Sequence, residues 1–348
     1  MTGFASRLCG SEPADRMPAN DATRPLARDA SSLFPEIEPY ASGRIVLDGM
    51  HEMHWEACGN PEGMPLVFLH GGPGGGCLPH HRRYYDPASW KIVLFDQRGA
   101  GRSSPIAEVS DNTTQHLIAD LERLREHLKV DRWVLFGGSW GSTLALAYGQ
   151  AHPHRVLGFV LRGIFLASEA EVDWFMHGMR RVFPEAWRAF AEFLPAHERD
   201  DLLGHYYRRL TNPDSTVHLP AAHAWDRYEA ACSTLLPSSD PLGKFAGDAA
   251  ALAIARIEAH YFVHRAFLAP DQLLDGIARI RHLPCEIVHG RYDIVCPVVT
   301  ADTLAHAWAA SRLTIVADAG HSVREPGITR ELLAAVKRMQ SVLAGSGG

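Results

Sequence analysis

The sequence predicts an α/β fold in which a doubly wound, mostly parallel sheet is interrupted by an inserted helical cap. Short apolar runs alternate with amphipathic helical segments in the first half of the chain, as in parallel strands joined by crossover helices. The alternation stops between about residues 165 and 280, where the sequence is helical and aromatic, and then resumes. In addition, a serine flanked by glycines stands where one apolar run gives way to a helix.

The first elements along the chain are a leader and a hairpin. Residues 1–32 mix Ser, Ala, Asp, Arg and Pro without apolar periodicity, so we expect a flexible leader. Polar and apolar residues alternate in 44–48 and 53–57, which predicts an antiparallel hairpin at a sheet edge. We expect the domains to be a core formed by 33–164 and 281–348, and a cap formed by 165–280.

Continuous apolar runs predict strands that are covered on both faces. They occupy residues 66–69, 92–95, 134–136 and 158–161, and two further strands are expected at 285–289 and 313–316, where the α/β pattern resumes. Between two of them, leucines recur at helical spacing from residue 113 to 128, after a capping Asn112 or Thr113. Further helices are expected at 143–151, 221–235, 249–266, 299–310 and 330–343.

Composition excludes several classes of function. The chain has 348 residues, a net charge of −6 and a pI near 6.4, which gives no basic field for nucleic acid or anionic lipid. It lacks both a membrane-length apolar run and a secretory signal pattern, so we expect a cytoplasmic protein. The six cysteines form no C-x-x-C pair, and H-E-x-x-H is absent. We therefore expect no disulfide framework, metal site or cofactor.

The segment Gly137-Gly138-Ser139-Trp140-Gly141 predicts a nucleophile. An apolar run enters it and a helical pattern leaves it, so the serine lies at the apex of a strand–turn–helix. Glycines two residues before and after Ser139 allow the sharp turn that exposes the hydroxyl.

A serine nucleophile needs a histidine base and an acid that orients it, here in the chain order Ser, Asp, His. Asp293 follows the strand expected at 285–289, and His321 follows the last predicted strand. Asp318 is the alternative acid, but it lies on the same loop as His321 and is badly placed to reach its ring. Asp96 is expected to hold its own turn, with Arg98 or Arg102 as a partner.

The glycine-rich run from His70 to Gly76 follows the first buried strand. Backbone N–H groups of Gly71 or Gly72 and of Trp140 are expected to form an oxyanion hole. The alternative is a phosphate-binding loop, but the run lacks the G-K-[ST] ending of that motif.

Two acids fall on the aromatic faces of the helices predicted in the cap. Glu229 and Glu258 share their stripes with Trp, Tyr, Phe and Ile residues. A carboxylate on an apolar face must find a partner, because its burial without one is costly. One interpretation is ion pairing within the cap, with Arg227, Arg256 or Arg265. The other is that both acids face the nucleophile and bind a substrate ammonium group.

Taken together, these motifs resemble those of the proline iminopeptidase (prolyl aminopeptidase) family of α/β-hydrolases. The resemblance covers about residues 34–343 and includes the glycine-rich loop, DQRGAGRS from residue 96, GGSWGSTLAL from residue 137 and the Gly-His pair at 320–321. The sequence departs from the family in its longer leader and in Tyr228, where many members carry a tryptophan.

The resemblance implies a role for each candidate residue. The family's triad carries over onto Ser139, Asp293 and His321, its oxyanion donors onto Trp140 and Gly71-Gly72, and its amine-binding acids onto Glu229 and Glu258. Its apolar pocket for the proline ring carries over onto Phe165, Trp174 and Phe175, and a thiol near that pocket onto Cys296.

The activity implied is that of a cofactor-free serine aminopeptidase that releases N-terminal proline from small peptides. A general esterase or amidase on the same fold is the alternative enzyme, and a catalytically inactive binding module is the alternative from another class.

Overall fold

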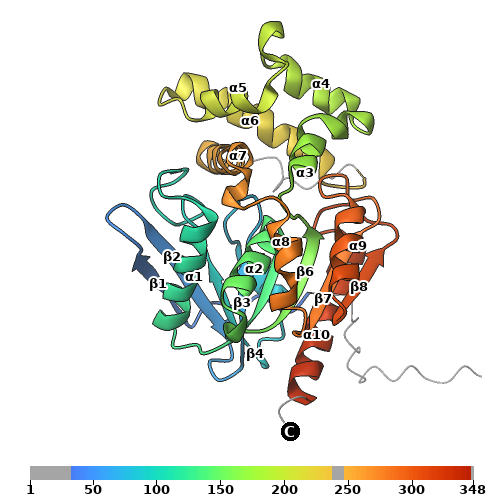
Figure 1. Ribbon diagram of the computed structural model, residues 1–348. Coiled ribbons are helices and arrows are strands. Elements are labelled where there is room, and N and C mark those ends of the chain that lie inside the picture. The colour runs from blue at the N-terminus through green and yellow to red at the C-terminus, as the bar shows by residue number, and fades with distance from the viewer. Residues whose placement is uncertain (1–32, 237–246, 346–348) are drawn as a thin grey trace, which may run out of the picture.

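The computed structural model describes residues 33–236 and 247–345 (Figure 1). The leader predicted at residues 1–32 lies outside the described residues. One sheet runs through the molecule with the strand order β1-β2-β4-β3-β5-β6-β7-β8. This mostly parallel sheet with helices on both faces confirms the predicted fold class.

The strands are β1 (Ala41–Val46), β2 (Glu52–Gly59), β3 (Met64–Leu69), β4 (Trp90–Phe95), β5 (Trp133–Ser139), β6 (Val156–Ile164), β7 (Cys285–Gly290) and β8 (Ser311–Val316). The α-helices are α1 (Thr114–His127), α2 (Trp140–Ala151), α3 (Glu169–Asp173), α4 (Pro184–Glu192), α5 (Leu202–Leu210), α6 (Ser215–Cys232), α7 (Asp248–Val263), α8 (Gln272–Asp275), α9 (Val298–Ala307) and α10 (Pro326–Gly345). Further helical segments include the 3₁₀-helices η1 (Pro79–Tyr84) and η7 (Arg265–Phe267) and the π-helix η3 (Trp174–Gly178).

The strands pair as the sequence predicts, with an antiparallel hairpin at one edge and parallel strands in the core. β1 and β2 form the predicted antiparallel hairpin at the edge, and β2 also runs antiparallel to β4. The pairs from β3 and β4 through to β7 and β8 are parallel, so these strands all end at the same edge of the sheet. That edge faces the helices drawn at the top of Figure 1.

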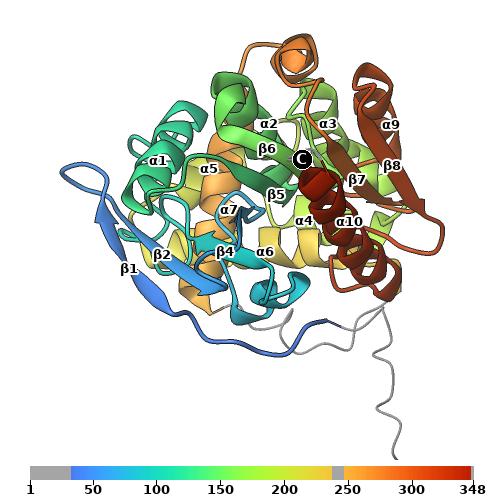
Figure 2. The same cartoon turned by 90° about the horizontal axis from the view of Figure 1, so that it is seen from below.

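Helices lie on both faces of the sheet, as Figure 2 shows from below. Each face has its own layer of buried apolar side chains. α1, α2 and α9 cover one face, where Leu121 and Leu144 pack with Leu135 of β5. α10 and η1 cover the other, where Leu332 packs with Phe136 and Val288. Consecutive strand residues thus alternate between two buried layers, which is why the strands are continuously apolar in sequence.

The segment between β6 and β7 forms helices above the carboxyl edge of the strands (Figure 1). We refer to α3–α7 as the cap and propose that they form the inserted unit expected from the sequence. α6 packs on α7, and both contact α5. The short helix α8 contacts α2 instead, so this part of the 165–280 range lies against the core.

The structure corrects the ends of several predicted helices, and two of them are in the cap. α6 begins at Ser215 rather than at residue 221 and includes Pro220 in its interior. α7 ends at Val263 rather than at residue 266, because Arg265, Ala266 and Phe267 have left-handed φ angles of 53°, 51° and 54°. Thr114 Oγ1 at the start of α1 donates to Ala266 O and helps to hold this turn.

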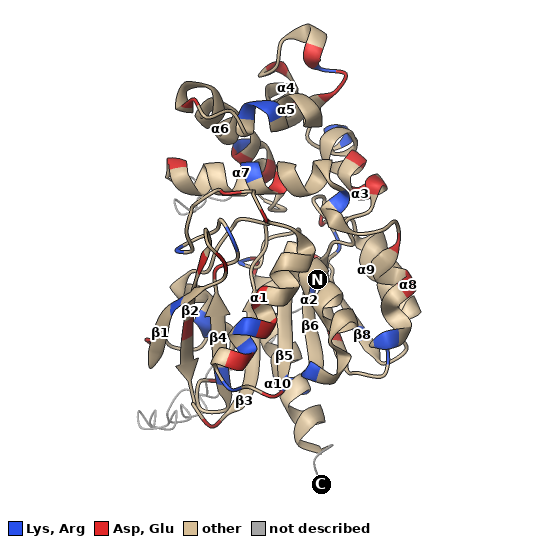
Figure 3. Ribbon diagram, turned by 60° about the vertical axis from the view of Figure 1, so that its left-hand side comes forward, with Lys and Arg blue, Asp and Glu red and all other residues tan. Residues whose placement is uncertain are grey.

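The distribution of charged and apolar residues in the structure agrees with the composition of the sequence. In the described part of the chain, acidic and basic residues are interspersed over core and cap (Figure 3). No described helix has the length and hydropathy needed to cross a membrane. The five described cysteines are free.

Candidate active site

Ser139 lies at the turn between β5 and α2, and its backbone is strained, with φ 56° and ψ −127°. The flanking glycines are required for steric reasons. A Cβ on Gly137 would collide with the carbonyl of Gly141, and one on Gly141 would collide with the carbonyl of Leu69 at the end of β3. The G-x-S-x-G spacing therefore lets the turn pack closely against the neighbouring strand.

Asp293 and His321 are in direct contact. His321 Nδ1 lies 2.8 Å from Asp293 Oδ2, and both side chains are buried. Burial raises the pKa of Asp293, but the charge and hydrogen bond of His321 outweigh it, so the net pKa is below the usual value. Asp318, the alternative acid, is exposed. Of the two aspartates, it is Asp293 that is placed to orient the imidazole.

A second histidine, which the sequence analysis overlooked, supports the acid. His289 at the end of β7 accepts a hydrogen bond from Ile164 N at Nδ1 (3.2 Å) and donates from Nε2 to Cys296 O (2.8 Å). Burial lowers the pKa of His289, so it is neutral. Its Nε2 is also 3.5 Å from Asp293 Oδ2, while Cys296 N donates to Oδ1 at 2.8 Å. The carboxylate of Asp293 is therefore held at both oxygens.

Two residues of β6 fix the position of His321. A Cβ on Gly163, whose φ is 51°, would lie 3.0 Å from His321 Cε1, so only glycine leaves room for the ring. Arg162 Nη1 donates to His321 O at 2.6 Å, and its guanidinium lies beneath Gly138 of the nucleophile turn. No sequence motif marks Arg162 as part of the site, because its partner His321 is distant along the chain.

Ser139 lies beside these groups. It pairs with Ile164 of β6, the residue after Gly163, and its side chain contacts the thiol of Cys296. Burial raises the pKa of that thiol well above its usual value, so Cys296 is protonated at neutral pH. The hydrogen bonds found among the described residues do not include one from Ser139 Oγ to His321 Nε2. Such bonds often tighten only when substrate binds.

The predicted oxyanion loop packs against the nucleophile turn. A Cβ on Gly71 would lie 3.4 Å from Ser139 Cβ, and Gly72 has a φ of 110° that favours glycine. Gln97 links the two sides of the site. Its backbone N–H donates to His70 Nε2 and its Oε1 accepts from Trp140 Nε1, both at 2.9 Å. Gly71 and Trp140 are thereby held next to Ser139.

Asp96 has the structural role expected for it. Its Oδ1 accepts from Cys77 N at 2.6 Å, and its Oδ2 accepts from Arg102 Nε at 2.9 Å. Arg98, the other partner considered, pairs with Asp120 at 2.6 Å. Asp96 therefore ties its own turn to the end of the glycine-rich loop.

Glu229 and Glu258 lie in the cap without a basic partner among the described residues. Trp225 Nε1 donates to Glu258 Oε2 at 2.5 Å. Arg256 instead donates to Leu210 O, and Arg265 pairs with Glu169. The described ion pairs include none between these two acids and an arginine or lysine. The predicted ion pairing with Arg227, Arg256 or Arg265 is therefore not found among the described residues.

The two acids influence each other's protonation. Burial, and then the charge of Asp226, raises the pKa of Glu229 to about 7. Burial and the charge of Glu229 raise the pKa of Glu258 well above its usual value, against the hydrogen bond from Trp225. Asp226 was not singled out from the sequence, although it is one helical turn before Glu229. Burial and mutual repulsion thus disfavour the ionised form of both acids, and a bound cation would stabilise it.

An aromatic wall adjoins these acids. The ring of Phe262 lies 6.0 Å from that of Phe165 and 5.4 Å from that of Phe175, and Phe175 stacks on Trp225 at 5.6 Å. Thr143 Oγ1, in the first turn of α2, donates to Phe165 O at 2.6 Å. Phe165 and Phe175 therefore both contact the ring of Phe262.

The third residue of the predicted apolar pocket, Trp174, is turned toward the loop of the acid. Its Nε1 donates to Ile294 O at 2.7 Å, and Ile294 directly follows Asp293. Trp174 thus joins the start of the cap to that loop.

α7 connects the acids to the nucleophile turn. The ring of Tyr261, one turn after Glu258, lies 4.6 Å from that of Trp140. A Cβ on Gly74 would lie 2.5 Å from Ala253 O, so the oxyanion loop touches the same helix. Glu258 is thus on a helix that contacts both sides of the proposed oxyanion hole.

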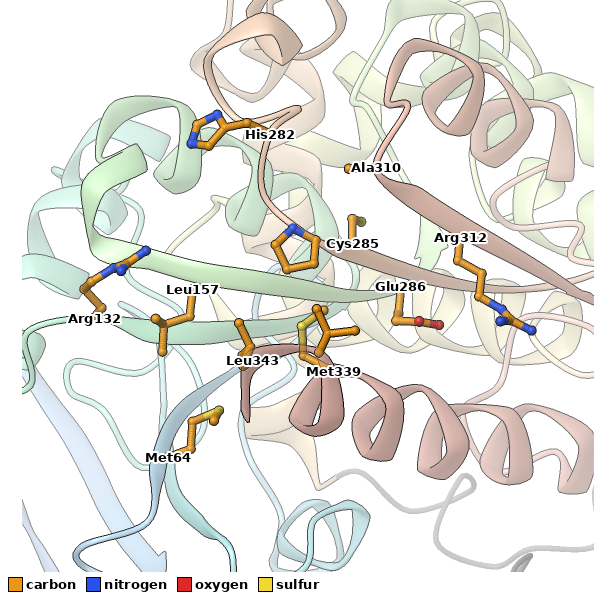
Figure 4. Close-up of a pocket in the computed structure, with 12 residues that line it drawn as sticks. Met64, Arg132, Leu157, His282, Cys285, Glu286, Ala310, Arg312, Met339 and Leu343 are labelled. Atoms are coloured by element: carbon orange, nitrogen blue, oxygen red, sulfur yellow. The ribbon is translucent and has the colours of Figure 1, made fainter. Parts of the chain in front are cut away.

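A cavity of about 670 Å³ lies elsewhere, at the opposite edge of the sheet (Figure 4). Arg132, Leu157, His282 and Met339 are among the residues that line it. None of the predicted site residues lines this cavity, so it is separate from the candidate active site.

In the described ranges no cluster of three or more His, Cys, Asp or Glu residues is arranged to hold a metal ion.

Comparison with known proteins gives consistent results. Residues 64–326 match the family model of the alpha/beta hydrolase fold. A probable proline iminopeptidase of Leptolyngbya boryana is 51% identical over 308 residues, 88% of this chain and 96% of the relative. Proline iminopeptidases of Xanthomonas citri and Arabidopsis thaliana are 50% and 48% identical, over 85% and 90% of this chain and 95% and 83% of their own.

Solved structures agree on the fold. A putative aryl esterase from Burkholderia cenocepacia superposes with a TM-score of 0.59 at 19% identity, covering 86% of this chain and 100% of its own. VinJ superposes with a TM-score of 0.58 at 20% identity, covering 87% and 99%. At such low identity these likenesses show the fold alone.

Proposed function

The chain belongs to the proline iminopeptidase family of α/β-hydrolases, and from that membership we propose how its residues release proline from the N-terminus of small peptides. Ser139 is the nucleophile, His321 the base and Asp293 the acid that keeps the proton on His321 Nδ1. The 2.8 Å contact between Asp293 and His321 supports these last two roles.

The reaction proceeds through a prolyl-enzyme. His321 Nε2 takes the proton of Ser139 as its Oγ attacks the prolyl carbonyl carbon. Backbone N–H groups of Gly71 or Gly72 and of Trp140 stabilise the oxyanion. His321 then gives its proton to the leaving amine as the C–N bond breaks, and a water activated by His321 hydrolyses the ester.

The assignment of N-terminal proline as the substrate rests on the two cap acids, Glu229 and Glu258. The secondary ammonium of an N-terminal proline has two N–H donors, one for each carboxylate. The rigid ring loses no rotamer freedom when it packs against Phe165 and Phe175. Both acids have raised pKa values, and neither has a basic partner in the described part of the cap. These two observations support a site that binds a cation.

A panel of aminoacyl-naphthylamides tests this function. The proline derivative should be cleaved with the highest kcat/KM, and Ser139→Ala should abolish turnover. Labelling of the wild type by a fluorophosphonate, and not of Ser139→Ala, should identify the nucleophile. Equal turnover of all amides would favour a general amidase, and a wild type that is neither labelled nor active would favour a binding module.

A further inference from the structure

The side chain of Glu325 links the loop of the base to the cap helix that carries Glu229. Its Oε2 accepts from Gly320 N at 2.8 Å, and its Oε1 accepts from Leu235 N at 3.2 Å. Gly320 directly precedes His321, and Leu235 lies just beyond the end of α6. One carboxylate therefore bridges two parts of the site that are far apart in sequence.

Neighbouring contacts strengthen this link. Ser322 N, on the other side of His321, donates to Ser233 O at 2.9 Å. Ser233 Oγ in turn donates to Glu229 O at 2.8 Å. A Cβ on Gly320 would lie 3.0 Å from both Glu325 Oε1 and Leu235 N, so the two segments are closely packed. A short path of hydrogen bonds thus runs from the base loop to the backbone of Glu229.

Glu325 is itself fixed to the core. It precedes Pro326, the first residue of α10, and its carbonyl accepts from Thr329 N at 2.9 Å. α10 packs on β6 and β7. The N–H groups of Gly320 and Leu235 donate to different oxygens of Glu325. A carboxylate has two such acceptor oxygens, whereas a carboxamide has only one.

We propose that Glu325 is a positioning residue that holds Glu229 of the cap in register with His321 of the core. The inference rests on the proposed function, in which Glu229 grips the ammonium while His321 acts on the carbonyl next to it. Both groups must be correctly placed at once, because small displacements of a bound substrate reduce the rate strongly. A neutral ester without an ammonium group does not need this register.

Two substrates separate this role from a general structural one. Glu325→Gln keeps the size of the side chain but loses one acceptor, and Glu325→Asp keeps the charge but shortens the reach. For both variants we expect kcat/KM for proline p-nitroanilide to fall at least tenfold relative to kcat/KM for p-nitrophenyl acetate. Glu331→Gln is the matched control, since Glu331 is on α10 and pairs with Arg330 at 3.2 Å. It should leave the ratio unchanged.

A double-mutant cycle gives an independent test. If Glu325 acts through Glu229, Glu325→Gln should cost much less kcat/KM for the prolyl amide in a Glu229→Gln background than in the wild type. Equal losses on both substrates in both variants, an unchanged ratio, or additive effects in the cycle would each overturn the proposal. Failure of the proposed function looks different: the wild type itself would then show no preference for the free prolyl amide over its N-acetyl form.

Discussion

At the scale of single residues, burial of the cap acids sets the pH range in which substrate should bind. Glu229, with a pKa of about 7, is protonated in the free enzyme at lower pH, and a neutral acid binds an ammonium group weakly. We expect KM for proline naphthylamide to rise as the pH falls from about 8 to about 6. Measuring KM across this range checks it.

The ester p-nitrophenyl acetate is the control for that pH profile, because it has no ammonium group. Its KM should vary little over the same range, while its kcat still reports on the base. Glu229→Gln should flatten the pH dependence of KM for the prolyl substrate. An identical KM profile in this variant and the wild type would rule out Glu229 as the titrating group.

Gly163 offers a second test at this scale. Alanine there would adopt an unfavourable φ of 51° and place its Cβ 3.0 Å from His321 Cε1, pushing the imidazole away from Ser139. We expect Gly163→Ala to lower kcat by roughly tenfold or more, with little change in KM. Gly49→Ala is the control, because nothing lies within 4 Å of its added Cβ. Similar kcat values for the two variants would contradict the placement of His321.

At the scale of elements, α6 contains a proline at a costly position. Pro220 lies inside the helix and is exposed, so it removes a helical hydrogen bond without a packing reason. Pro220→Ala should raise the free energy of unfolding by about 2 kcal/mol, after the entropy that proline removes from the unfolded chain is taken into account. Urea denaturation checks it.

Pro326 provides the matched control. It is the first residue of α10, where the missing N–H has no helical partner and the fixed φ is favourable. Pro326→Ala should therefore give no increase in stability. If Pro220→Ala is no more stable than this control, the interior proline of α6 is not a source of strain.

The same helix shows why sequence predicts some elements better than others. The buried strands were predicted because their apolar runs are continuous, and Thr113 caps α1 through its side chain, as one of two candidates. The start of α6 was missed because proline usually ends a helix. Here packing on α4, α5 and α7 overrides that preference. The left-handed turn after α7 contains no glycine and leaves no local signal.

The residues of the candidate site likewise divide into those that the sequence predicts and those that it does not. Ser139 was predicted from local turn chemistry, and His321 and Asp293 from their places after strands. His289, Arg162 and Glu325 were missed because each acts through a partner brought near only by folding. Whether an acid in the cap is paired also depends on where each arginine points, which sequence cannot say.

At the scale of the whole molecule, the account depends on the cap facing its acids toward a core that carries the nucleophile. α7 contacts Trp140 and the glycine-rich loop, and the end of α6 contacts the His321 loop. Cap and core are thus joined on both sides of Ser139. In the proposed mechanism the cap selects the substrate and the core cleaves the bond, so the two functions should be separable by mutation.

The most direct measurement compares kcat/KM for proline naphthylamide and its N-acetyl derivative in the wild type, Glu229→Gln and Glu258→Gln. Charge-assisted hydrogen bonds contribute roughly 1.5–3 kcal/mol each. The account predicts a wild type that strongly prefers the free amine, and losses on the order of 100-fold in each variant for that substrate alone. Equal kcat/KM for the free and blocked substrates in the wild type would contradict it.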